Sequence, residues 1–355
     1  MHINKKLNNK ILIIGSDGYI GTVLSDYLLK KKYEVTTLDT GYFRDGLLEK
    51  KISSKINIDI RKFDLSKLKF YKAVVFLAAN QNDPGGKISP KKFYYISQKF
   101  TLKVASICKK YKVKFIFPSS CSVYGYGKKK FSEQSKAKPL TFYSKNKIEI
   151  ERGLSRMADK SFSPVALRFS TIFGYSPRIR FDLVINMFCL FSIVKKKLYL
   201  NSHGLSWRPH LSVEDACEAI HLSLKKKIQN GKLNIFNVGH NKNNMQIIKV
   251  ARLISSITGS KIYFKLDEKK SFIADKNVTN GIDKRSYTVN FSKFKKAFPG
   301  FKQKKNLKSE IKTLINKLKK LNVSKKTLDD YKFYRLQKMD FLLKNKKIDK
   351  DLFWL

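Results

Sequence analysis

The pattern of apolar and polar positions near the start of the chain predicts a strand, a turn, a helix and a second strand. Four consecutive apolar residues, 11–14, predict a buried parallel strand. Three glycines follow at intervals of three, and apolar residues then recur every three or four positions as far as Leu28. A second strand, predicted at 34–38, ends at Asp39. The segment 10–39 is therefore predicted to form one parallel strand–helix–strand unit.

The glycines at the predicted turn favour the binding of a dinucleotide. Gly15 lets the chain turn sharply off the strand, Gly18 leaves room for a pyrophosphate, and Gly21 lets helix and strand pack closely. The start of the helix offers free N–H groups and the positive end of its dipole to phosphates. Asp39 can accept hydrogen bonds from both hydroxyls of an adenosine ribose and would repel a 2′-phosphate. We therefore predict that this turn binds a cofactor, and that the cofactor is NAD rather than NADP. The alternative is that the glycines form merely a tight turn.

The same alternation of apolar strands and helical segments continues beyond this unit. Strands are predicted at 55–60, 73–77, 114–117 and 164–169, and helical segments are predicted between them. This order predicts an α/β fold, a Rossmann-type doubly wound parallel sheet. Ligands bind to such sheets outside the carboxyl ends of the strands. The residues predicted at those ends are Gly15, Asp39, Asp59, Ala78, Ser120 and Phe169.

From about residue 175 onward the periodic pattern loosens, which predicts a smaller C-terminal α/β part that caps the sheet. No internal repeat is visible. The last residues are rich in lysine and predict helices with exposed charge. We predict three parts: a cofactor-binding Rossmann domain over 1–175 that is completed by parts of 205–240, a substrate-binding part over 176–320, and a lysine-rich helical tail over 321–355.

The net charge of +48 changes this picture less than its size suggests. So basic a chain would suit nucleic acid, an anionic membrane surface or an acidic substrate. However, only eleven of the 75 basic residues are arginines, and the lysines are scattered along the chain. Proteins that bind nucleic acids usually concentrate basic residues on one face and use arginine for bidentate contacts. We therefore expect no nucleic acid as the main partner, and keep a non-catalytic RNA-binding protein of the same fold as the alternative from another class.

Three further features bear on the location of the protein. No stretch reaches the roughly 18–20 apolar residues of a membrane span, and the longest, 183–194, is interrupted by Asn186. The first ten residues lack the apolar core of a secretion signal. The four cysteines have no metal-ligand spacing and need not form disulfides. We therefore expect a cytoplasmic protein with no membrane span and no metal site.

The strongest chemical signal is Tyr143-x-x-x-Lys147 on a helix predicted over 143–157. Residues four apart share a face of a helix, so Lys147 is expected beside the hydroxyl of Tyr143. A free phenol with a pKa of about 10 is a poor base, but a neighbouring ammonium and the positive nicotinamide of bound NAD both favour the phenolate. Ser120, at the end of the preceding strand, would hold the same substrate oxygen. We predict that Tyr143 takes a proton from a substrate hydroxyl while NAD takes the hydride from the same carbon; an ordinary surface pair is the alternative.

Taken together, these motifs resemble the extended short-chain dehydrogenase/reductase family, and specifically its NAD-dependent epimerase/dehydratase group, which acts on nucleotide sugars. The resemblance covers about residues 10–310 and leaves the tail uncovered. The matching segments, in the order of the family, are Gly15-x-x-Gly18-x-x-Gly21, Asp39, Asp59-Ile60-Arg61, Leu77-Ala78-Ala79, Ser119-Ser120-Cys121-Ser122-Val123-Tyr124-Gly125, Tyr143-x-x-x-Lys147, Leu167-Arg168-Phe169, Arg208-Pro209-His210 with Val213-Glu214-Asp215, and Phe236-Asn237-Val238-Gly239.

The resemblance implies which residues contact the cofactor and which contact the substrate, a nucleotide-diphosphate sugar. The implied cofactor contacts are Gly15, Gly18, Tyr19, Ile20, Gly21, Asp39, Asp59, Ile60, Leu77, Ala78, Ala79, Tyr143, Lys147 and Phe169. The implied substrate contacts are Cys121, Ser122, Asn186, Arg208 and Arg285, the last three at the diphosphate. Arg208 and Arg285 could instead form structural contacts such as ion pairs. The resemblance also implies a homodimer formed through two helices of the sheet domain.

Two positions depart from the dehydratases of this family. Cys121 and Ser122 stand where those enzymes carry an Asp-Glu pair that protonates the leaving hydroxyl. Dehydration is therefore disfavoured, and Cys121 is either an acid/base or a small packed residue behind the cleft. We predict an NAD-dependent nucleotide-sugar epimerase that acts at C4 with Tyr143 as the base. A nucleotide-sugar 4-dehydrogenase, ketoreductase or dehydratase of the same family is the alternative.

Overall fold

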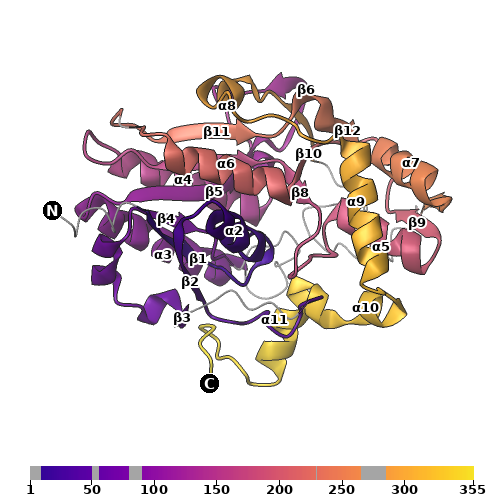
Figure 1. Cartoon of the computed structure of the whole chain (residues 1–355), viewed down its shortest axis with the longest axis horizontal. Coiled ribbons are helices and arrows are strands. Elements are labelled where there is room, and N and C mark those ends of the chain that lie inside the picture. The colour runs from indigo at the N-terminus through magenta and orange to yellow at the C-terminus, as the bar shows by residue number, and fades with distance from the viewer. Residues whose placement is uncertain (1–8, 50–55, 80–89, 229, 265–284) are drawn as a thin grey trace.

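The centre of the molecule is one seven-stranded parallel sheet (Figure 1). The strands lie in the order β11-β7-β5-β4-β1-β2-β3, and all pairings between them are parallel. They are β1 (Lys10–Ile14), β2 (Glu34–Asp39), β3 (Ile56–Asn57), β4 (Ala73–Phe76), β5 (Lys114–Ser120), β7 (Val165–Phe169) and β11 (Asn234–Val238). The chain moves outward from β1 in both directions, which confirms the predicted Rossmann-type sheet. The computed structural model describes residues 9–49, 56–79, 90–228, 230–264 and 285–355.

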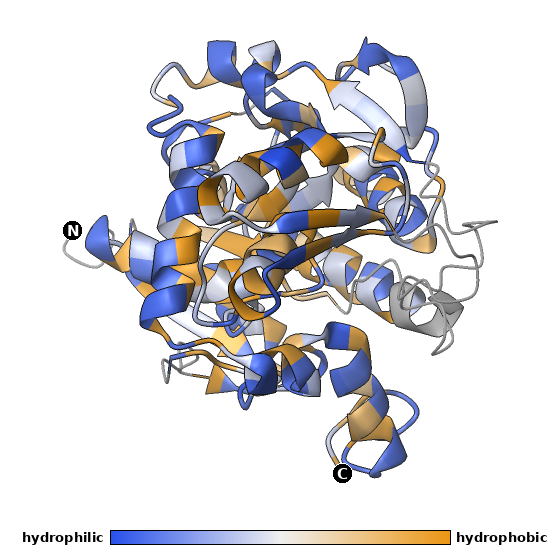
Figure 2. Cartoon of the chain, turned by 90° about the vertical axis from the view of Figure 1, so that its right-hand side faces the viewer, coloured by the Kyte–Doolittle hydropathy of each residue, from blue (hydrophilic) through white to orange (hydrophobic). Residues whose placement is uncertain are grey.

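Helices cover both faces of the sheet because alternate residues of its strands point to opposite faces. These helices are α2 (Tyr19–Lys30), α3 (Pro90–Lys110), α4 (Phe142–Met157) and α6 (Val213–Lys225). Ile11 and Ile13 of β1 pack in one core with α2 and α6. Leu12 and Ile14 pack in a second core with α3 and α4. Figure 2 shows apolar residues concentrated in the central strands, and both polar and apolar residues on the helices, as expected for a sheet that is buried on both faces.

A smaller part of the molecule lies beside the sheet and has a core of its own. Its helices are α5 (Val184–Val194), α7 (Ile247–Thr258) and α9 (Leu307–Lys320), whereas α8 (Ser292–Ala297) packs against β11 of the large sheet. Its strands form three small sheets, from β8 (Thr171–Phe173), β10 (Trp207–Ser212) and β12 (Asn244–Gln246), from β9 (Lys197–Leu200) and β13 (Lys261–Phe264), and from β6 (Tyr126–Phe131) and β14 (Ser286–Val289). Buried residues of α5, α7 and α9 share this core with Tyr19, the first residue of α2. The smaller part therefore adjoins the turn that precedes α2.

The C-terminal tail returns to the large sheet. Its helices are α10 (Lys325–Asp329) and α11 (Arg335–Lys344), and the last residues lie near β3 in Figure 1. The tail forms a small core with the loop that follows β2. The buried residues of this core are Tyr42, Phe43, Met339, Leu342, Ile348 and Leu352. The prediction of exposed charge was incomplete, because Lys338 is buried and lies 2.7 Å from Asp45. Among the described residues, no helix is both long and apolar enough to cross a membrane.

Candidate active site

The turn after β1 is shaped by two glycines that have no room for a side chain. Gly15 has a φ of +92°, and a Cβ atom on it would lie 2.5 Å from the backbone nitrogen of Ala78. A Cβ atom on Gly21 would lie 2.3 Å from the carbonyl oxygen of Gly15. The turn, α2 and the end of β4 can therefore approach this closely only with glycine at both positions. Gly18 precedes α2 without a capping side chain, so no cap competes for the first N–H groups of the helix.

Asp39 ends β2 with its carboxylate fixed by two backbone N–H groups. The N–H of Gly41 donates to one oxygen at 2.8 Å, and the N–H of Asp17 donates to the other at 3.0 Å. Burial, and then the nearby carboxylate of Asp17, raises the pKa of Asp39 to about 6. Arg44 opposes this rise, and its Nε lies 2.6 Å from the Asp17 carboxylate. Asp39 is therefore ionised at neutral pH and held in one orientation, as a ribose-binding carboxylate requires.

A pocket that is partly open to solvent lies at the glycine turn and the ends of β1, β2 and β4. The pocket brings together eight of the predicted cofactor residues, Gly15, Gly18, Asp39, Asp59, Ile60, Leu77, Ala78 and Ala79. Several other residues that line it are not among the predicted contacts, namely Tyr42, Phe43, Arg61, Ile96, Ser97, Phe100, Arg335 and Leu352. The helical spacing of 96, 97 and 100 could have indicated one of these walls.

The other predicted cofactor residues lie outside this pocket, and they are Tyr19, Ile20, Gly21, Tyr143, Lys147 and Phe169. Tyr19 is buried, and its hydroxyl donates to the carbonyl oxygen of Gly174 at 2.8 Å. Ile20 packs between the core of the sheet and that of the smaller part. Phe169 is buried at the end of β7, directly beside Ser120 of β5. These residues therefore lie beneath the pocket or beside it and do not line it.

Tyr143 and Lys147 lie at the start of α4, which begins with a capping box at Thr141. The Nζ atom of Lys147 lies 5.7 Å from the centre of the Tyr143 ring. The same Nζ donates a hydrogen bond to the carbonyl oxygen of Pro118 in β5. Because Pro118 lies two residues before Ser120, Lys147 ties the start of α4 to the strand end that carries Ser120. The structure therefore brings the three predicted catalytic positions to neighbouring elements.

The charge of Lys147 is weakened by its surroundings. Burial lowers the pKa of Lys147 to about 7; the carboxylate of Glu151 opposes this change, and the cation of Arg335 contributes to it. Glu151 supports the ammonium only partly, because Arg168 holds its two carboxylate oxygens at 3.0 and 2.6 Å. Lys147 is therefore close to the midpoint of its titration at neutral pH. This buried Glu151–Arg168 pair also fixes α4 against β7, and with it the orientation of Tyr143.

The two positions that differ from dehydratases are buried behind the end of β5. Cys121 is 1 % exposed, and its thiol donates to the carbonyl oxygen of Arg168 at 3.1 Å. Burial raises the pKa of this thiol. Ser122 donates its N–H to the hydroxyl of Ser120 at 3.2 Å, and its own hydroxyl is buried without a hydrogen-bond partner among the described residues. The structure thus places Cys121 as a packed residue rather than at the surface of the cleft.

Asn186 and Arg208, which the resemblance places at the substrate diphosphate, both make hydrogen bonds within the protein. The side chain of Asn186 accepts from the N–H of Gly174 at 2.9 Å and donates to the hydroxyl of Tyr19 at 3.2 Å. Arg208 is 7 % exposed and donates to the carbonyl oxygen of Arg285. The structure therefore brings the two arginines together, while the amide of Asn186 supports the start of α2.

The fold and these contacts define a Rossmann-type dinucleotide-binding enzyme with a Tyr-x-x-x-Lys site. Residues 11–239 match the NAD dependent epimerase/dehydratase family, and the chain belongs to this family.

Two curated relatives cover most of the chain. It is 27 % identical over 281 residues to a UDP-glucose 4-epimerase of Lactobacillus helveticus, which covers 70 % of this chain and 82 % of the relative. This chain is 29 % identical over 278 residues to YtcB of Bacillus subtilis (strain 168), described as an uncharacterized UDP-glucose epimerase. This alignment covers 73 % of this chain and 85 % of the relative.

Solved structures share the fold of this chain at lower identity. A UDP-glucuronic acid 4-epimerase from Bacillus cereus, in complex with UDP-glucuronic acid and NAD, aligns with a TM-score of 0.70 and 23 % identity over 88 % of this chain and 99 % of its own. A UDP-glucose 4-epimerase from Thermotoga maritima aligns with a TM-score of 0.71 and 22 % identity over 88 % of this chain and 100 % of its own. At these identities the structures support the fold alone.

The family, the enzymatic character and the NAD cofactor predicted from the sequence are confirmed by the family match, and the fold class is confirmed by the parallel sheet. The pocket fits NAD in two respects that its own geometry shows. Of the turn 15–21, the glycines Gly15 and Gly18 line the pocket and add no side chain to it, and Asp39 presents an ionised, fixed carboxylate for a ribose. Within the described residues, no three His, Cys, Asp or Glu side chains come together as metal ligands would.

Proposed function

We propose that this enzyme is a nucleotide-sugar epimerase that inverts C4 of the sugar through a transient ketone. The observation that carries the proposal is the position of Tyr143 and Lys147 at the start of α4, tied through Pro118 to the strand end with Ser120. UDP-glucose epimerase is also the activity named for the two curated relatives, at 27 % and 29 % identity.

Tyr143 acts as the base, and Ser120 donates a hydrogen bond to the same substrate oxygen. Tyr143 takes the proton of the C4 hydroxyl as the carbonyl forms, which a positioned phenol can do when its anion is stabilised. When bound, NAD supplies a reversible hydride acceptor. The ketone turns in the site, and Tyr143 returns the proton to the oxygen once the opposite face of the carbon has been reduced. Each turnover therefore ends with the cofactor in its starting oxidation state.

Lys147 supports this proton transfer by charge and by position. Its ammonium form favours the phenolate of Tyr143, and its hydrogen bond to Pro118 fixes the helix that carries the base. Because its pKa is about 7, Lys147 can gain and lose a proton near neutral pH.

The alternative activities within the family differ from epimerisation in the final state of the cofactor or in the acid that they need. A 4-dehydrogenase or ketoreductase would use the same three residues but would change the oxidation state of the cofactor. A dehydratase needs an acid that Ser122 and the buried thiol of Cys121 do not supply. The substrate we propose is a nucleotide-diphosphate sugar, with Arg208 and Arg285 near its diphosphate. A homodimer through two helices of the sheet domain stays a prediction.

The proposal is tested by incubating the enzyme with UDP-glucose and with UDP-glucuronic acid, without added NAD. We expect a C4-inverted sugar by NMR and no net absorbance of NADH. Replacing Tyr143 with Phe should lower turnover by roughly 10²–10⁴-fold while NAD stays bound. Tyr126→Phe, at a tyrosine that is 56 % exposed, is the matched control and should keep wild-type turnover. Net NADH formation would assign a dehydrogenase, and full turnover in Tyr143→Phe would exclude Tyr143 as the base.

A further inference from the structure

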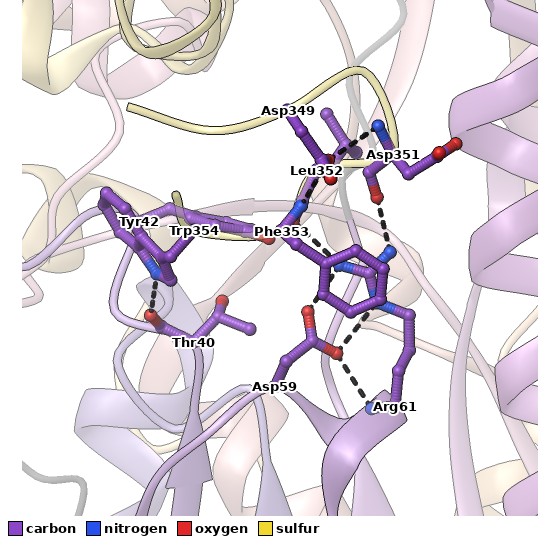
Figure 3. Close-up of polar contacts among 9 residues, drawn as sticks. All are labelled: Thr40, Tyr42, Asp59, Arg61, Asp349, Asp351, Leu352, Phe353 and Trp354. Atoms are coloured by element: carbon purple, nitrogen blue, oxygen red, sulfur yellow. Dashed lines mark hydrogen bonds and ion pairs between the residues drawn. The ribbon is translucent and has the colours of Figure 1, made fainter. Parts of the chain in front are cut away.

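The last seven residues of the chain, 349–355, fold into a turn across the ends of β2 and β3 (Figure 3). We call this segment the C-terminal turn. Trp354 donates to the carbonyl oxygen of Thr40, the residue after β2, at 2.7 Å. Arg61 donates to two carbonyl oxygens of the turn, one of them that of Leu352 at 2.7 Å. Segments that are 290 or more positions apart in the sequence therefore form one continuous surface.

The C-terminal turn is held in one conformation by its own contacts. The carboxylate of Asp349 accepts the N–H of Asp351 at 2.8 Å and that of Phe353 at 2.9 Å. Leu352 has a φ of +62°, a left-handed conformation that leucine rarely adopts. Such a conformation persists only where the surroundings impose it, and it is frequent at ligand sites. Leu352 is also 3 % exposed and lines the cofactor pocket, so the turn directs it to that position.

Arg61 connects the C-terminal turn to the end of the pocket that carries Asp59. Its guanidinium holds the two carboxylate oxygens of Asp59 at 2.9 and 2.6 Å. The same guanidinium lies 3.5 Å from the centre of the Phe353 ring. Figure 3 shows the two side chains next to each other. The carboxylate that the resemblance places at the adenine is therefore engaged by Arg61. Ile60 and Leu352 supply apolar surface at this end, which suits the face of an aromatic base.

Arg335, the first residue of α11, lines the pocket near the glycine turn. Its guanidinium donates to the carbonyl oxygen of Ala79 at 3.3 Å, next to the residue that borders Gly15. Burial, and then the cation of Arg180, lowers the pKa of Arg335 to about 9. A cation whose charge is disfavoured in this way is stabilised by an anion. A glycine turn before a helix is also the place where a dinucleotide binds its diphosphate.

Two further contacts hold α11 in place. Lys338 of this helix is 4 % exposed and lies 2.7 Å from the carboxylate of Asp45. Arg178 donates to the carbonyl oxygen of Lys332, just before the helix, at 2.8 Å. The position of Arg335 is therefore fixed by contacts with the loop after β2 and with the smaller part of the molecule.

We propose that the C-terminal tail is a wall of the NAD site, with Arg335 at the diphosphate and Leu352 against the adenine. The tail then retains the cofactor between turnovers, and NAD leaves only when the C-terminal turn detaches from Thr40 and Arg61. The family match ends at residue 239, so these two residues lie outside the segment that defines the family. The inference rests on the NAD cofactor of the family and does not depend on which sugar is epimerised.

The test measures NAD dissociation from the full chain loaded with NAD. Leu352→Gly removes the side chain but keeps a residue that adopts a positive φ readily, so the turn should persist. Arg335→Met removes the charge and keeps much of the apolar stem. We expect the dissociation rate to rise roughly 3–10-fold for Leu352→Gly and roughly 10–100-fold for Arg335→Met. NAD should also slow hydrogen exchange at the amides of 349–355.

The matched controls change the same residue types away from the pocket. Leu355→Gly alters a side chain that is 79 % exposed at the end of the same turn. Lys344→Met removes a cation from the other end of α11, where it pairs with Asp340. Both should retain wild-type NAD dissociation. Wild-type dissociation in folded Leu352→Gly and Arg335→Met, or unchanged exchange in 349–355, would overturn the proposal. Because the readout is bound NAD, failure of the epimerase assignment would leave this result unaffected.

Discussion

The two walls of the NAD pocket are built in different ways. One wall consists of the glycine turn and the strand ends that carry Asp39 and Ala78, and its shape is set by backbone packing in a parallel sheet. The other wall consists of Arg335 and Leu352, which reach the pocket from the C-terminal tail. We call them the sheet wall and the tail wall. The sheet wall cannot move without disrupting the core, whereas the tail wall depends on a limited set of side-chain contacts.

This difference has a consequence for how the cofactor leaves. The strands next to the sheet wall belong to cores that extend over both faces of the sheet. The tail wall rests on a small separate core and on hydrogen bonds from Arg61 and Trp354. Regions with few buried contacts open locally at a free energy lower than that of global unfolding. We therefore expect the sheet wall to determine whether NAD binds, and the tail wall to determine how long it stays.

The largest effect is expected from a substitution in the sheet wall, Gly15→Ala. The new Cβ atom would lie 2.5 Å from a backbone nitrogen, at a φ of +92°. We expect a loss of at least roughly 2–3 kcal/mol in the free energy of unfolding, together with loss of bound NAD. Denaturant unfolding and NAD content measure both. Gly300→Ala is the control, since its nearest new contact is 3.8 Å away. Equal stability of the two variants would contradict a rigid sheet wall.

Asp39→Asn tests the sheet wall without altering its shape. We expect NAD affinity to fall roughly 10–100-fold, because a hydrogen bond to a charged group is lost. In the wild type, affinity should fall as the pH drops through about 6, the pKa of Asp39, because the carboxylate becomes protonated. Titration of NAD binding against pH measures this, and the variant should show no such step. Glu149→Gln, at an exposed carboxylate on α4, should keep the wild-type profile.

The stability of the NAD-free enzyme should depend on pH in the opposite sense. The pKa of Asp39 is raised from 3.8 to about 6, so the folded state binds this proton more tightly than the unfolded state. The contribution of Asp39 to stability is therefore present below pH 3.8 and lost as the pH rises to about 6. Unchanged pH dependence in Asp39→Asn, in both experiments, would refute the role of this carboxylate.

Arg61→Lys tests how the two walls are connected. Lysine keeps the charge but cannot hold both oxygens of Asp59 and the carbonyl of Leu352 together, because it lacks the planar fork. We expect NAD dissociation to accelerate roughly 3–10-fold, with little change in global stability. Stopped-flow dissociation measures the first, and denaturant unfolding the second. Arg152→Lys, in an exposed pair on α4, should change neither. A large loss of global stability would show that the tail wall does not open separately.

The smallest effect is expected from Trp354→Phe. This change removes the hydrogen bond to Thr40 and keeps an aromatic ring near Tyr42, whose ring centre lies 5.4 Å away. The local opening of the C-terminal turn should become easier by roughly 0.5–1.5 kcal/mol. Hydrogen exchange in 349–355 should quicken accordingly, and NAD dissociation should rise less than for Arg61→Lys. An effect on NAD larger than that of Arg61→Lys would show that Trp354 is the main anchor of the turn.

The sheet wall could be predicted from the sequence because each of its features is encoded locally. The glycines indicate a turn that can bind a dinucleotide, and Asp39 follows directly after a predicted strand. Outside this wall, the spacing of Tyr143 and Lys147 is likewise encoded within one helix. The tail wall could not be predicted in this way. Met339 and Leu342 indicate an apolar helix face, but nothing in the sequence indicates that Tyr42 and Phe43 cover it.

The sequence also did not predict which polar side chains form hydrogen bonds or ion pairs within the protein. The pairing of Asp59 with Arg61 and the hydrogen bonds of Asn186 depend on side-chain directions that a motif does not specify. The burial of Cys121 likewise follows from the packing of the loop after β5 against α4 and β14 rather than from its position beside Ser120. Motifs therefore predicted the strand ends at which the pocket lies, while the tertiary contacts decided which of its polar groups remain accessible.

The most direct test of the account is to purify the chain without added cofactor, denature it and identify the released nucleotide. The central claim is that one NAD is held between the sheet wall and the tail wall through every turnover. We predict about one NAD per wild-type chain and clearly less from Leu352→Gly. Release of NADP, or of no dinucleotide from the folded wild-type chain, would contradict the claim.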